Sequence, residues 1–379
     1  MRVKQSRWRE AVGWEEETSD PLSDSAQLVL VFGSSSILKT SDRLDDIRRM
    51  YPRSHLFGCS TAGEICGTQV TDDSLVVTAV NFEHTTLRTA SVRVTDPEKS
   101  FEAGEQLAQA LVKEGLVHAL ILSEGLRING SDLVKGLERH LPAAVTVTGG
   151  LSGDGARFNE TVVICDGPPE TGTVAVVGLY GERLKVGYGC LGGWDSFGPE
   201  RLITKSHGNV LYELDGKSAL ELYKRYLGEH ADGLPATGLL FPLSIRVPGG
   251  ETAVVRTILG VSERDQSMTF AGDVPMGGYA RLMKANFDRL IDGAVGAARN
   301  TQETLGDSAP ALAILISCVG RKLVLQQRVE EEVEGVREVL GRETVLTGFY
   351  SYGEISPFTP EAKCELHNQT MTITTLTER

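Results

Sequence analysis

The chain has 379 residues, of which 41% are hydrophobic and 23% charged, and its net charge is −13. This length predicts two or three domains of roughly 150 residues each. The negative charge opposes binding along a nucleic-acid backbone, and no stretch offers the roughly 20 apolar residues that a membrane-spanning helix needs. The N-terminus also lacks the apolar segment of a secretory signal. We therefore expect a cytoplasmic protein whose partners include neither nucleic acid nor membrane.

The first half of the chain contains two units of strand, helix and strand. Residues 1–25 are polar and predict a solvated arm, with regular structure beginning at Gln27. Apolar runs and helical spacing then predict, in chain order, a strand at 28–32, a helix at 42–50, strands at 55–57, 75–82 and 86–94, a helix at 101–114, a strand at 119–122, a helix at 131–140, and strands at 145–148, 161–165, 173–180 and 184–189. The strands at 75–82 and 86–94 are expected to pair with each other in antiparallel fashion.

The second half begins near a helix expected at 218–227, where the character of the sequence changes. We place the domain boundary there, which gives an arm over 1–25 and domains over 26–220 and 221–379. The later elements are expected as extended segments at 238–243, 251–261 and 268–270, a turn at 272–278, a long helix at 279–305, a strand at 311–318, a helix at 330–340, and strands at 344–347 and 369–376. The pattern predicts an α/β (mixed α+β) fold in which strand–helix–strand units form mixed parallel and antiparallel sheets flanked by helices.

Three glycine-rich turns follow the second strand of these units. The turns Gly58–Ile65 and Gly348–Ile355 share a G-x4-G-E-I frame, and Gly149–Asp154 is a looser relative. Glycines allow backbone N–H groups to converge on a ligand, and the acidic side chain can accept its hydrogen bonds. Alternatively, the glycines only form the turn and the carboxylate caps a neighbouring element. The candidate ligand-binding residues in the turns are Gly58, Cys59, Ser60, Thr61, Gly63, Glu64, Gly149, Gly150, Ser152, Asp154, Tyr350, Ser351, Tyr352 and Glu354.

Catalytic motifs are weak. The sequence has no phosphate-binding loop and no dinucleotide fingerprint, and Ser60 and Ser351 do not lie in a G-x-S-x-G elbow. An enzyme that uses Cys59 or Glu64 remains an alternative, but it would need a base within reach of the nucleophile. The six cysteines show neither metal-ligand nor disulfide spacing. We therefore expect buried thiols and no catalytic residue.

A second candidate site is the run Cys364–Met371, which is dense in side chains that bind ligands. Within it, Cys364 and Asn368 are candidate ligand-binding residues. His367 could donate to a ligand, coordinate iron, or bond a backbone carbonyl.

These residues carry a resemblance to a known family. The segment Phe57–Ile65 and the turn Gly149–Asp154 resemble the FIST N domain, so that 26–220 is similar to that domain. Four stretches of 221–379 resemble the FIST C domain: Val255–Val261, Phe270–Pro275, Gly348–Ile355 and Cys364–Thr370. The resemblance covers the chain from about residue 26 to its end.

The resemblance implies a cytoplasmic sensory module, not an enzyme, that binds a small ligand such as an amino acid. Stand-alone members with this layout include haem proteins that sense nitric oxide and regulate a separate histidine kinase. Because we find no attached output domain, the resemblance implies a separate effector protein. For the haem alternative, His367 is the leading candidate axial ligand, with Cys59 and Tyr352 behind it. A protein that binds a kinase without any ligand, as an adaptor, is a further alternative.

Overall fold

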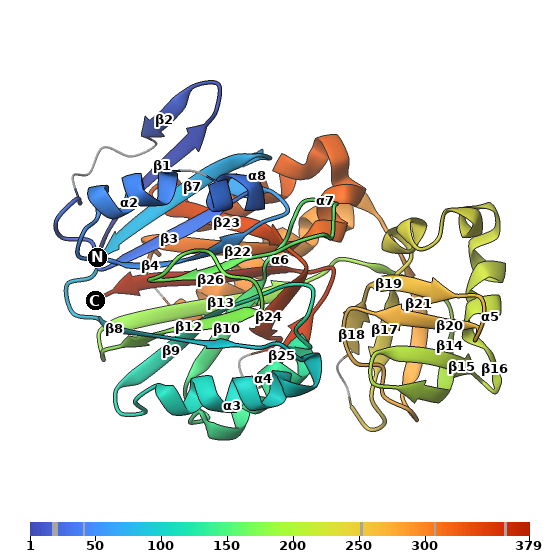
Figure 1. Cartoon of the computed structure of the whole chain (residues 1–379). Coiled ribbons are helices and arrows are strands. Elements are labelled where there is room, and N and C mark those ends of the chain that lie inside the picture. Colours follow the sequence, from blue (N-terminus) through green and yellow to red (C-terminus); the bar gives the residue numbers. More distant parts are fainter. Residues whose placement is uncertain (17–21, 41, 251–252, 307, 360–361) are drawn as a thin grey trace.

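The computed structural model describes residues 1–379 except 17–21, 41, 251–252, 307 and 360–361. The chain forms a large body and a smaller lobe, which consists of residues 195–284 (Figure 1). Across the described ranges, no helix combines the length and the apolar content needed to cross a bilayer.

Among the described residues, the body contains three six-stranded sheets. Sheet 1 runs β11 (Val163–Cys165), β4 (His55–Ser60), β3 (Leu28–Gly33), β7 (Ser74–Asn81), β1 (Arg2–Arg9), β2 (Gly13–Glu16). Sheet 2 runs β25 (Cys364–His367), β24 (Gly353–Pro357), β10 (Thr146–Leu151), β9 (Leu116–Ser123), β12 (Thr173–Tyr180), β8 (Thr86–Arg93). Sheet 3 runs β13 (Leu184–Leu191), β26 (Met371–Glu378), β22 (Leu312–Cys318), β23 (Val345–Ser351), β5 (Glu64–Cys66), β6 (Gln69–Thr71).

The three sheets repeat one plan. Each has a central parallel pair, β3 with β4, β9 with β10 or β22 with β23, and antiparallel neighbours on both sides. The strand that follows each glycine turn leaves its own unit and pairs with the sheet of another: β5 with β23, β24 with β10, and β11 with β4. The expected mixed α+β fold with mixed sheets is confirmed, and its three units exchange strands in a cycle.

The body helices cover the outer faces of these sheets. They are α1 (Ser35–Thr40), α2 (Arg43–Met50), α3 (Ser100–Ala110), α4 (Gly130–His140), α6 (Phe287–Leu305), α7 (Val319–Leu325) and α8 (Val329–Leu340). In Figure 1, α3 and α4 lie against each other below sheet 2. Because both faces of a central strand are covered, all six residues of β3 are buried, as the continuous apolar run predicts.

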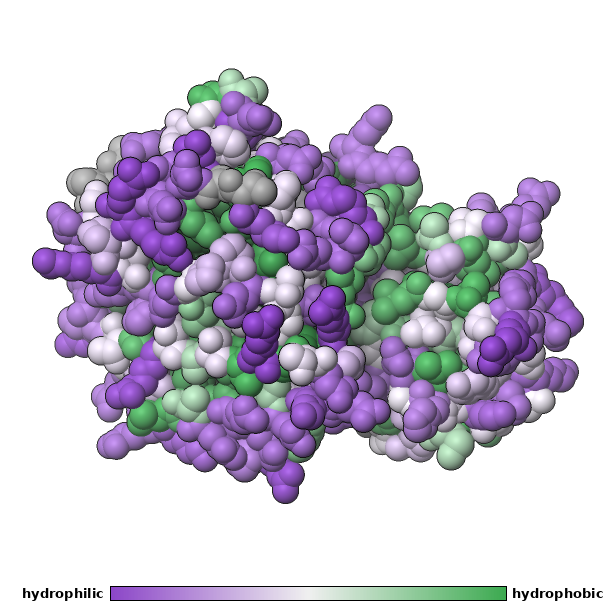
Figure 2. All heavy atoms as spheres, in the orientation of Figure 1, coloured by the Kyte–Doolittle hydropathy of each residue, from purple (hydrophilic) through white to green (hydrophobic). Residues whose placement is uncertain are grey.

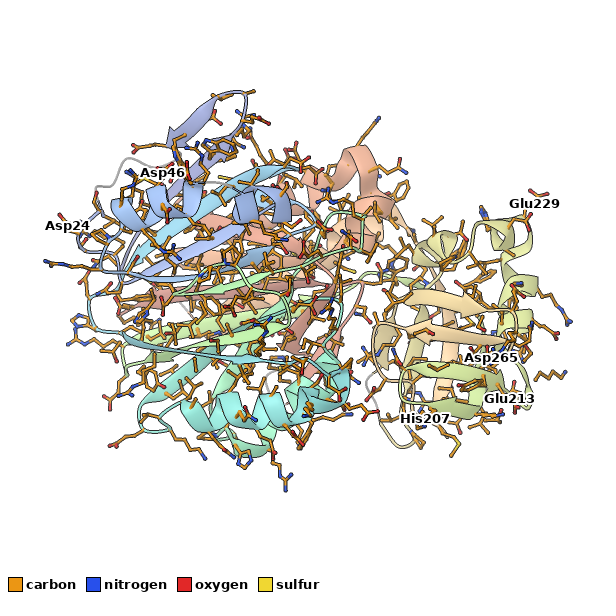
Figure 3. All side chains as sticks on the ribbon, viewed as in Figure 1. Asp24, Asp46, His207, Glu213, Glu229 and Asp265 are labelled. Atoms are coloured by element: carbon orange, nitrogen blue, oxygen red, sulfur yellow. The ribbon has the colours of Figure 1, made fainter. Side chains whose placement is uncertain are left out.

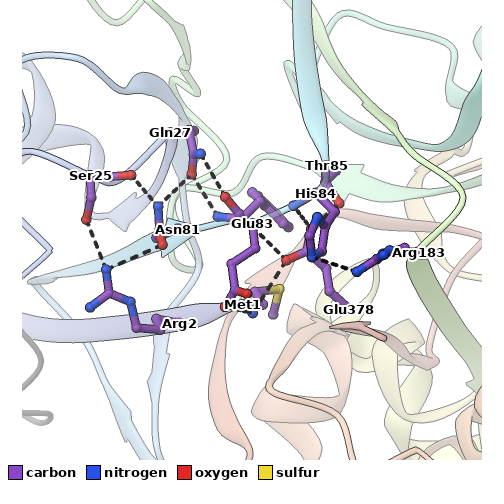
Figure 4. A network of polar contacts seen from close by, with 11 residues as sticks. Met1, Arg2, Ser25, Gln27, Asn81, Glu83, His84, Thr85, Arg183 and Glu378 are labelled. Atoms are coloured by element: carbon purple, nitrogen blue, oxygen red, sulfur yellow. Dashed lines mark hydrogen bonds and ion pairs between the residues drawn. The ribbon is translucent and has the colours of Figure 1, made fainter.

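The Glu378 carboxylate joins the last strand to residues near the other chain end and to the loop between β7 and β8 (Figure 4). Its Oε1 accepts hydrogen bonds from the His84 N–H and the Thr85 hydroxyl, at 2.9 and 2.6 Å. Its Oε2 accepts from the Glu83 N–H and lies 3.4 Å from the amino group of Met1. Glu378 in the last strand, β26, therefore connects Met1 with the loop between β7 and β8.

The lobe is an insertion between β13 and α6 with its own apolar core. Its sheet runs β18 (Ala253–Arg256), β17 (Leu243–Arg246), β21 (Tyr279–Lys284), β14 (Asp195–His207), β15 (Val210–Leu214), β20 (Ser267–Phe270), β19 (Ile258–Ser262), and β16 (Lys217–Ser218) pairs with β15. The helix α5 (Ala219–Leu227) packs on this sheet. The division between residues 220 and 221 stays a prediction, and both residues lie in α5.

The expectation of a solvated arm is wrong for the described part of the N-terminus. β1 pairs with β7 along its whole length. The side chain of Gln5 is buried, and its Nε2 donates to the Leu346 carbonyl at 2.9 Å. Hydrogen bonds inside the sheet satisfy polar side chains that look like surface residues in the sequence.

Two expected elements also differ. β7 and β8 do not pair with each other, because β8 joins sheet 2 through β12. The helix expected at 279–305 begins only at Phe287, with the Asn286 side chain as its cap, and 279–284 is the strand β21. Pairing with β14 and β17 overrides the helical spacing there.

The first glycine of each turn is required by close strand packing. A Cβ at Gly348 would overlap the Leu315 carbonyl, and the equivalent Gly149 and Gly58 face Ile121 and Val31 in the same way. We expect Gly348→Ala to lower the free energy of unfolding by about 1 to 3 kcal/mol, because the clash involves backbone atoms that cannot rotate away. Urea unfolding measures this effect. Gly341→Ala is the matched control, since φ is also positive there but nothing lies within 4 Å of the added carbon. Equal losses in the two variants would show that packing is not the cause.

Candidate functional site

A cleft of about 760 Å³ lies between the body and the lobe. Figure 2 shows hydrophobic residues gathered along this junction. The body wall consists of Pro97 and of residues that follow β9, begin α4, belong to or precede α7, or flank the turns: Gly125, Leu126, Arg127, Ile128, Asn129, Gly130, Leu151, Ala156, Phe158, Cys318, Val319, Gly320, Leu323 and Tyr352. The lobe wall includes Asn209, Pro235, Ala236, Leu239, Thr257, Ile258, Leu259, Phe270, Ala271 and Gly272. Its size and its two-sided lining are those of a small-molecule site.

The cleft exposes large apolar side chains on both walls. Leu126, Phe158 and Leu323 of the body and Leu259 of the lobe are between 37% and 49% exposed. Among the described residues that line the cleft, Arg127 alone carries a charge. The wall therefore favours a ligand with a substantial apolar surface.

Two aromatic rings stack in the body wall. The rings of Phe158 and Tyr352 lie 4.4 Å apart at 16°. The Tyr352 hydroxyl donates to the Gly155 carbonyl and accepts from the Phe158 N–H, both at 3.2 Å. Phe158 has a φ of +50°, a conformation that costs a bulky residue about 1 to 3 kcal/mol. The loop therefore holds the Phe158 ring against Tyr352 at the expense of backbone strain.

Side chains bridge the two parts beside the cleft. The Arg256 guanidinium of the lobe donates to the Leu366 carbonyl of the body at 2.8 Å. Gln369 of the body donates to the Thr257 hydroxyl of the lobe at 3.0 Å. Burial lowers the pKa of Arg256 to about 10, which still leaves the guanidinium charged at neutral pH. These bonds connect the lobe to the final β25–β26 segment of the body.

The carboxylates of the first and third turns are fully engaged by the chain itself. Glu354 Oε1 accepts from the Ser351 hydroxyl at 2.6 Å, and Oε2 accepts from the N–H and hydroxyl of Thr370 at 3.1 and 2.9 Å. Glu64 repeats this arrangement with the Thr61 hydroxyl and with the N–H and hydroxyl of Ser74. Burial raises the pKa of Glu64 to about 7 and that of Glu354 to about 8, although these bonds oppose the shift.

The three turns do meet, through their backbones. The Ala62 N–H donates to the Tyr350 carbonyl, the Gly153 N–H donates to the Ser60 carbonyl, and the Tyr352 N–H donates to the Leu151 carbonyl. In the second turn, Asp154 accepts from the Ser35 hydroxyl and pairs with Arg157 at 2.6 and 2.7 Å. The turns thus contact one another, and each of these N–H groups donates to a backbone carbonyl of another turn.

Of the residues singled out in the sequence, Tyr352 lines the cleft. The other candidates are buried and do not line it: Gly58, Cys59, Ser60, Thr61, Gly63, Glu64, Gly149, Gly150, Ser152, Asp154, Tyr350, Ser351, Glu354, Cys364, His367 and Asn368. Their roles in ligand binding stay predictions. For Cys59, packing in the apolar core raises the thiol pKa well above its ordinary value, which does not support a nucleophile.

Comparison with known sequences identifies the family. The sequence profile of the FIST N domain matches residues 27–217, and that of the FIST C domain matches residues 219–357. The chain belongs to the FIST family. The resemblance seen in the sequence is thereby confirmed, and FIST domains indicate a sensory or signalling module that binds a small ligand.

Relatives of this FIST protein add little about its ligand. An uncharacterised protein of Methanocaldococcus jannaschii is 22% identical over 340 residues, which cover 81% of this chain and 63% of the relative. The chain therefore spans less than two thirds of that relative's length. Among solved structures, cyanuric acid hydrolase from A. caulinodans aligns with 78% of this chain and 99% of its own, at 12% identity and a TM-score of 0.18. An alignment with so low a TM-score supports no conclusion about the fold or function of this chain.

The surroundings of His367 bear on the haem alternative, in which this residue is the leading axial ligand. The ring is buried, and its Nε2 lies 2.9 Å from the Ser356 carbonyl. Burial lowers its pKa to about 4. His367 also does not line the cleft. This arrangement does not fit a haem held by His367.

Sequence reasoning missed most of the cleft. Two stretches that carry the family resemblance, Val255–Val261 and Phe270–Pro275, supply Thr257, Leu259 and Gly272 to its lobe wall. They were therefore a usable signal, although most of the residues that they supply to the wall are apolar or glycine, and their charged residues, Arg256 and Asp273, do not line it. Arg127 and Phe158 lie in loops of the body, and no pattern in the sequence connects them with the lobe.

Proposed function

We propose that this FIST protein is a sensor whose ligand, a small organic molecule, binds in the cleft between body and lobe. The observation that carries the proposal is the two-sided cleft itself, with exposed apolar side chains on both walls. Burying them against a ligand is favourable by roughly 25 cal/mol for each Å² of apolar surface. Because the ligand touches both walls, it binds one arrangement of body and lobe better than others and shifts the population toward it.

The signal then passes to a separate effector protein, such as a histidine kinase, which reads the arrangement of the lobe. Two side chains already connect this arrangement to the body, Arg256 and Gln369. A ligand that contacts Thr257 or Gly320 lies next to Gln369, because the Gln369 amide packs against both residues. Binding therefore acts on the bonds that fix the lobe.

Within the sensor class, an organic ligand is favoured over haem with nitric oxide as its signal. The haem version needs an axial ligand, whereas His367 bonds a backbone carbonyl and Cys59 is packed in the apolar core. Tyr352 lines the cleft, but its hydroxyl already bonds the Gly155 carbonyl and the Phe158 N–H. An absorption spectrum decides between them. A sharp Soret band that moves with nitric oxide, and that is lost in His367→Ala, would overturn our preference.

The cleft is tested by ligand-induced stabilisation. We expect members of a panel of amino acids, organic acids and neutral aromatic compounds to raise the melting temperature of the wild-type protein. A ligand at a hundred times its Kd adds about 2.7 kcal/mol to the free energy of unfolding. In Leu259→Trp, the larger side chain fills the cleft from the exposed position on β19 and removes the effect.

The matched control is Leu202→Trp, which enlarges another exposed leucine of the lobe outside the cleft lining and keeps the response. Stabilisation that survives Leu259→Trp would place the ligand elsewhere. A panel without any response would favour the ligand-free adaptor. Stabilisation by a compound that the protein then converts chemically would favour the enzyme.

A further inference from the structure

We propose that the ligand of this cleft is a flat, apolar carboxylate, such as an aromatic or heteroaromatic acid, rather than a zwitterionic amino acid. The inference rests on the proposed function and specifies the ligand of the same site. Three features of the cleft carry it: an exposed aromatic residue with a strained backbone, a single positively charged residue and the absence of acidic residues from the described lining.

The Phe158 ring is a preformed stacking surface. Its backbone is held at a φ that bulky residues avoid, and its N–H is fixed by the Tyr352 hydroxyl. One face of the ring is covered by the Tyr352 ring, so the exposed part of the side chain is its edge and other face. Backbone strain persists only where the surroundings impose it, and it concentrates at ligand-binding sites. An exposed ring held in this way favours a flat partner, which can stack in an offset arrangement.

Among the described residues that line the cleft, the only charge is positive. Arg127 is an exposed residue of the cleft wall, and in the described part of the chain its side chain forms no ion pair. Its backbone N–H donates to the buried Glu124 carboxylate at 2.7 Å. The labelled lobe carboxylates, Glu213, Glu229 and Asp265, lie on the side of the lobe that faces away from the body (Figure 3). The Asp273 carboxylate does face the body, where it pairs with Lys135 at 2.7 Å. The described lining residues include no Asp or Glu. A ligand ammonium group would therefore lose water without gaining a counter-ion, whereas a carboxylate would gain one.

Two further groups strengthen the positive character of this wall. Arg256 is buried beside the lining residue Gly272, and its hydrogen bonds go to backbone carbonyls, while the nearby Glu365 and Asp273 carboxylates partly offset its charge. The helix α4 begins at Gly130, which also lines the cleft, so that the positive end of its dipole lies at this wall. Neither group is a site by itself, but both favour an anion near Arg127.

The test uses ligands that share one ring and differ in charge. Isothermal titration calorimetry compares indole-3-acetate, tryptophan and tryptamine, which are an anion, a zwitterion and a cation. We expect indole-3-acetate to bind about tenfold or more tightly than the other two. Phenylacetate and cyclohexylacetate then compare flat and puckered rings of equal charge, and the flat ring is expected to bind several times more tightly.

Variants test which residue causes the preference for an anion and which causes the preference for a flat ring. Arg127→Gln is expected to weaken indole-3-acetate about tenfold and to abolish its advantage over tryptophan. Phe158→Leu is expected to remove the preference for phenylacetate over cyclohexylacetate, and Phe158→Tyr to retain it. Arg225→Gln and Phe197→Leu are the controls, because they change an exposed arginine and an exposed phenylalanine of the lobe outside the lining. Circular dichroism checks that each variant is folded.

The outcomes separate this inference from the proposed function. If tryptophan or tryptamine binds as tightly as indole-3-acetate, or if Arg127→Gln and Phe158→Leu leave both preferences unchanged, the inference is wrong while the cleft remains the site. If the same probes bind Leu259→Trp as well as the wild type, the cleft is not the site and both fail. Absence of binding by the acids at about 1 mM also overturns the inference.

Discussion

Arg321→Met is expected to lower the free energy of unfolding by about 3 to 5 kcal/mol, because it leaves a buried carboxylate without its counter-ion. The side chains of Arg321 in α7 and Glu332 in α8 are both fully buried. Arg321 Nη2 lies 2.6 Å from Glu332 Oε2, and Oε1 accepts from the Tyr350 and Ser317 hydroxyls at 2.6 and 3.1 Å. The substitution therefore disturbs a network that reaches the third glycine turn.

Arg321 also forms hydrogen bonds with both chain segments that connect the body to the lobe. Its guanidinium donates to the carbonyl of Gly192, just before the lobe begins, and to that of Leu290, just after it ends, the latter at 2.7 Å. The same helix, α7, contributes Val319 and Leu323 to the cleft. Loss of the side chain is thus expected to loosen the lobe as well as the body.

Urea unfolding of three variants tests this assignment. Arg328→Met, which breaks exposed pairs with Glu331 and Asp288, is the matched control and should cost much less than Arg321→Met. The double variant Arg321→Met with Glu332→Leu removes both charges and should recover much of the loss. A single-variant loss no larger than that of Arg328→Met would contradict the role of the pair.

The strand–helix–strand units could be predicted from the sequence because the pattern of each element lies within a few neighbouring residues. The apolar run Leu28–Phe32 and the helical spacing of 42–50 are each set by neighbouring residues, and both elements are present. The exchange of β5, β11 and β24 between units could not be read, because pairing with a distant sheet leaves no local pattern. The same reason explains the wrong pairing expected for β7 and β8.

The candidate site was harder to predict than the fold because its walls come from distant segments. Residues near positions 126, 158, 258 and 320 meet only once the lobe has folded against the body. The sequence drew attention instead to groups with evident chemistry, such as Glu64, Glu354 and His367. In the structure, backbone or hydroxyl groups of the chain itself bond each of these three. The polar side chains that stand out in the sequence thus stabilise the fold. The cleft, in contrast, is lined largely by apolar residues and backbone.

The two turn carboxyls predict an unusual pH dependence of stability. Burial raises the pKa of Glu64 to about 7 and that of Glu354 to about 8, above an ordinary value of 4.5. The folded protein therefore binds more protons than the unfolded chain between these values, so stability falls as the pH rises. The loss begins above pH 4.5 and is complete once the pH has passed about 8. It amounts to on the order of 3 to 5 kcal/mol for each carboxyl.

Glutamine at these positions should remove this dependence, because its amide resembles the protonated carboxyl. In Glu354→Gln, the amide oxygen can accept from the N–H and hydroxyl of Thr370, and its NH2 group can donate to the Ser351 hydroxyl oxygen. We expect Glu354→Gln to match the wild type within about 1 kcal/mol at pH 6 and to exceed it at pH 9. The double variant with Glu64→Gln should show the flattest profile.

Urea unfolding at intervals from pH 5 to pH 9 measures these profiles. Glu378→Gln is the control, because hydrogen bonds from Thr85 and the neighbouring backbone outweigh burial and lower the Glu378 pKa. Its contribution is present above the unfolded pKa and is lost only at lower pH, so this variant should be less stable than the wild type throughout the range. If Glu354→Gln is instead destabilised most at pH 9, the carboxyl is ionised in the folded protein, and its three donors stabilise the charge more than burial opposes it.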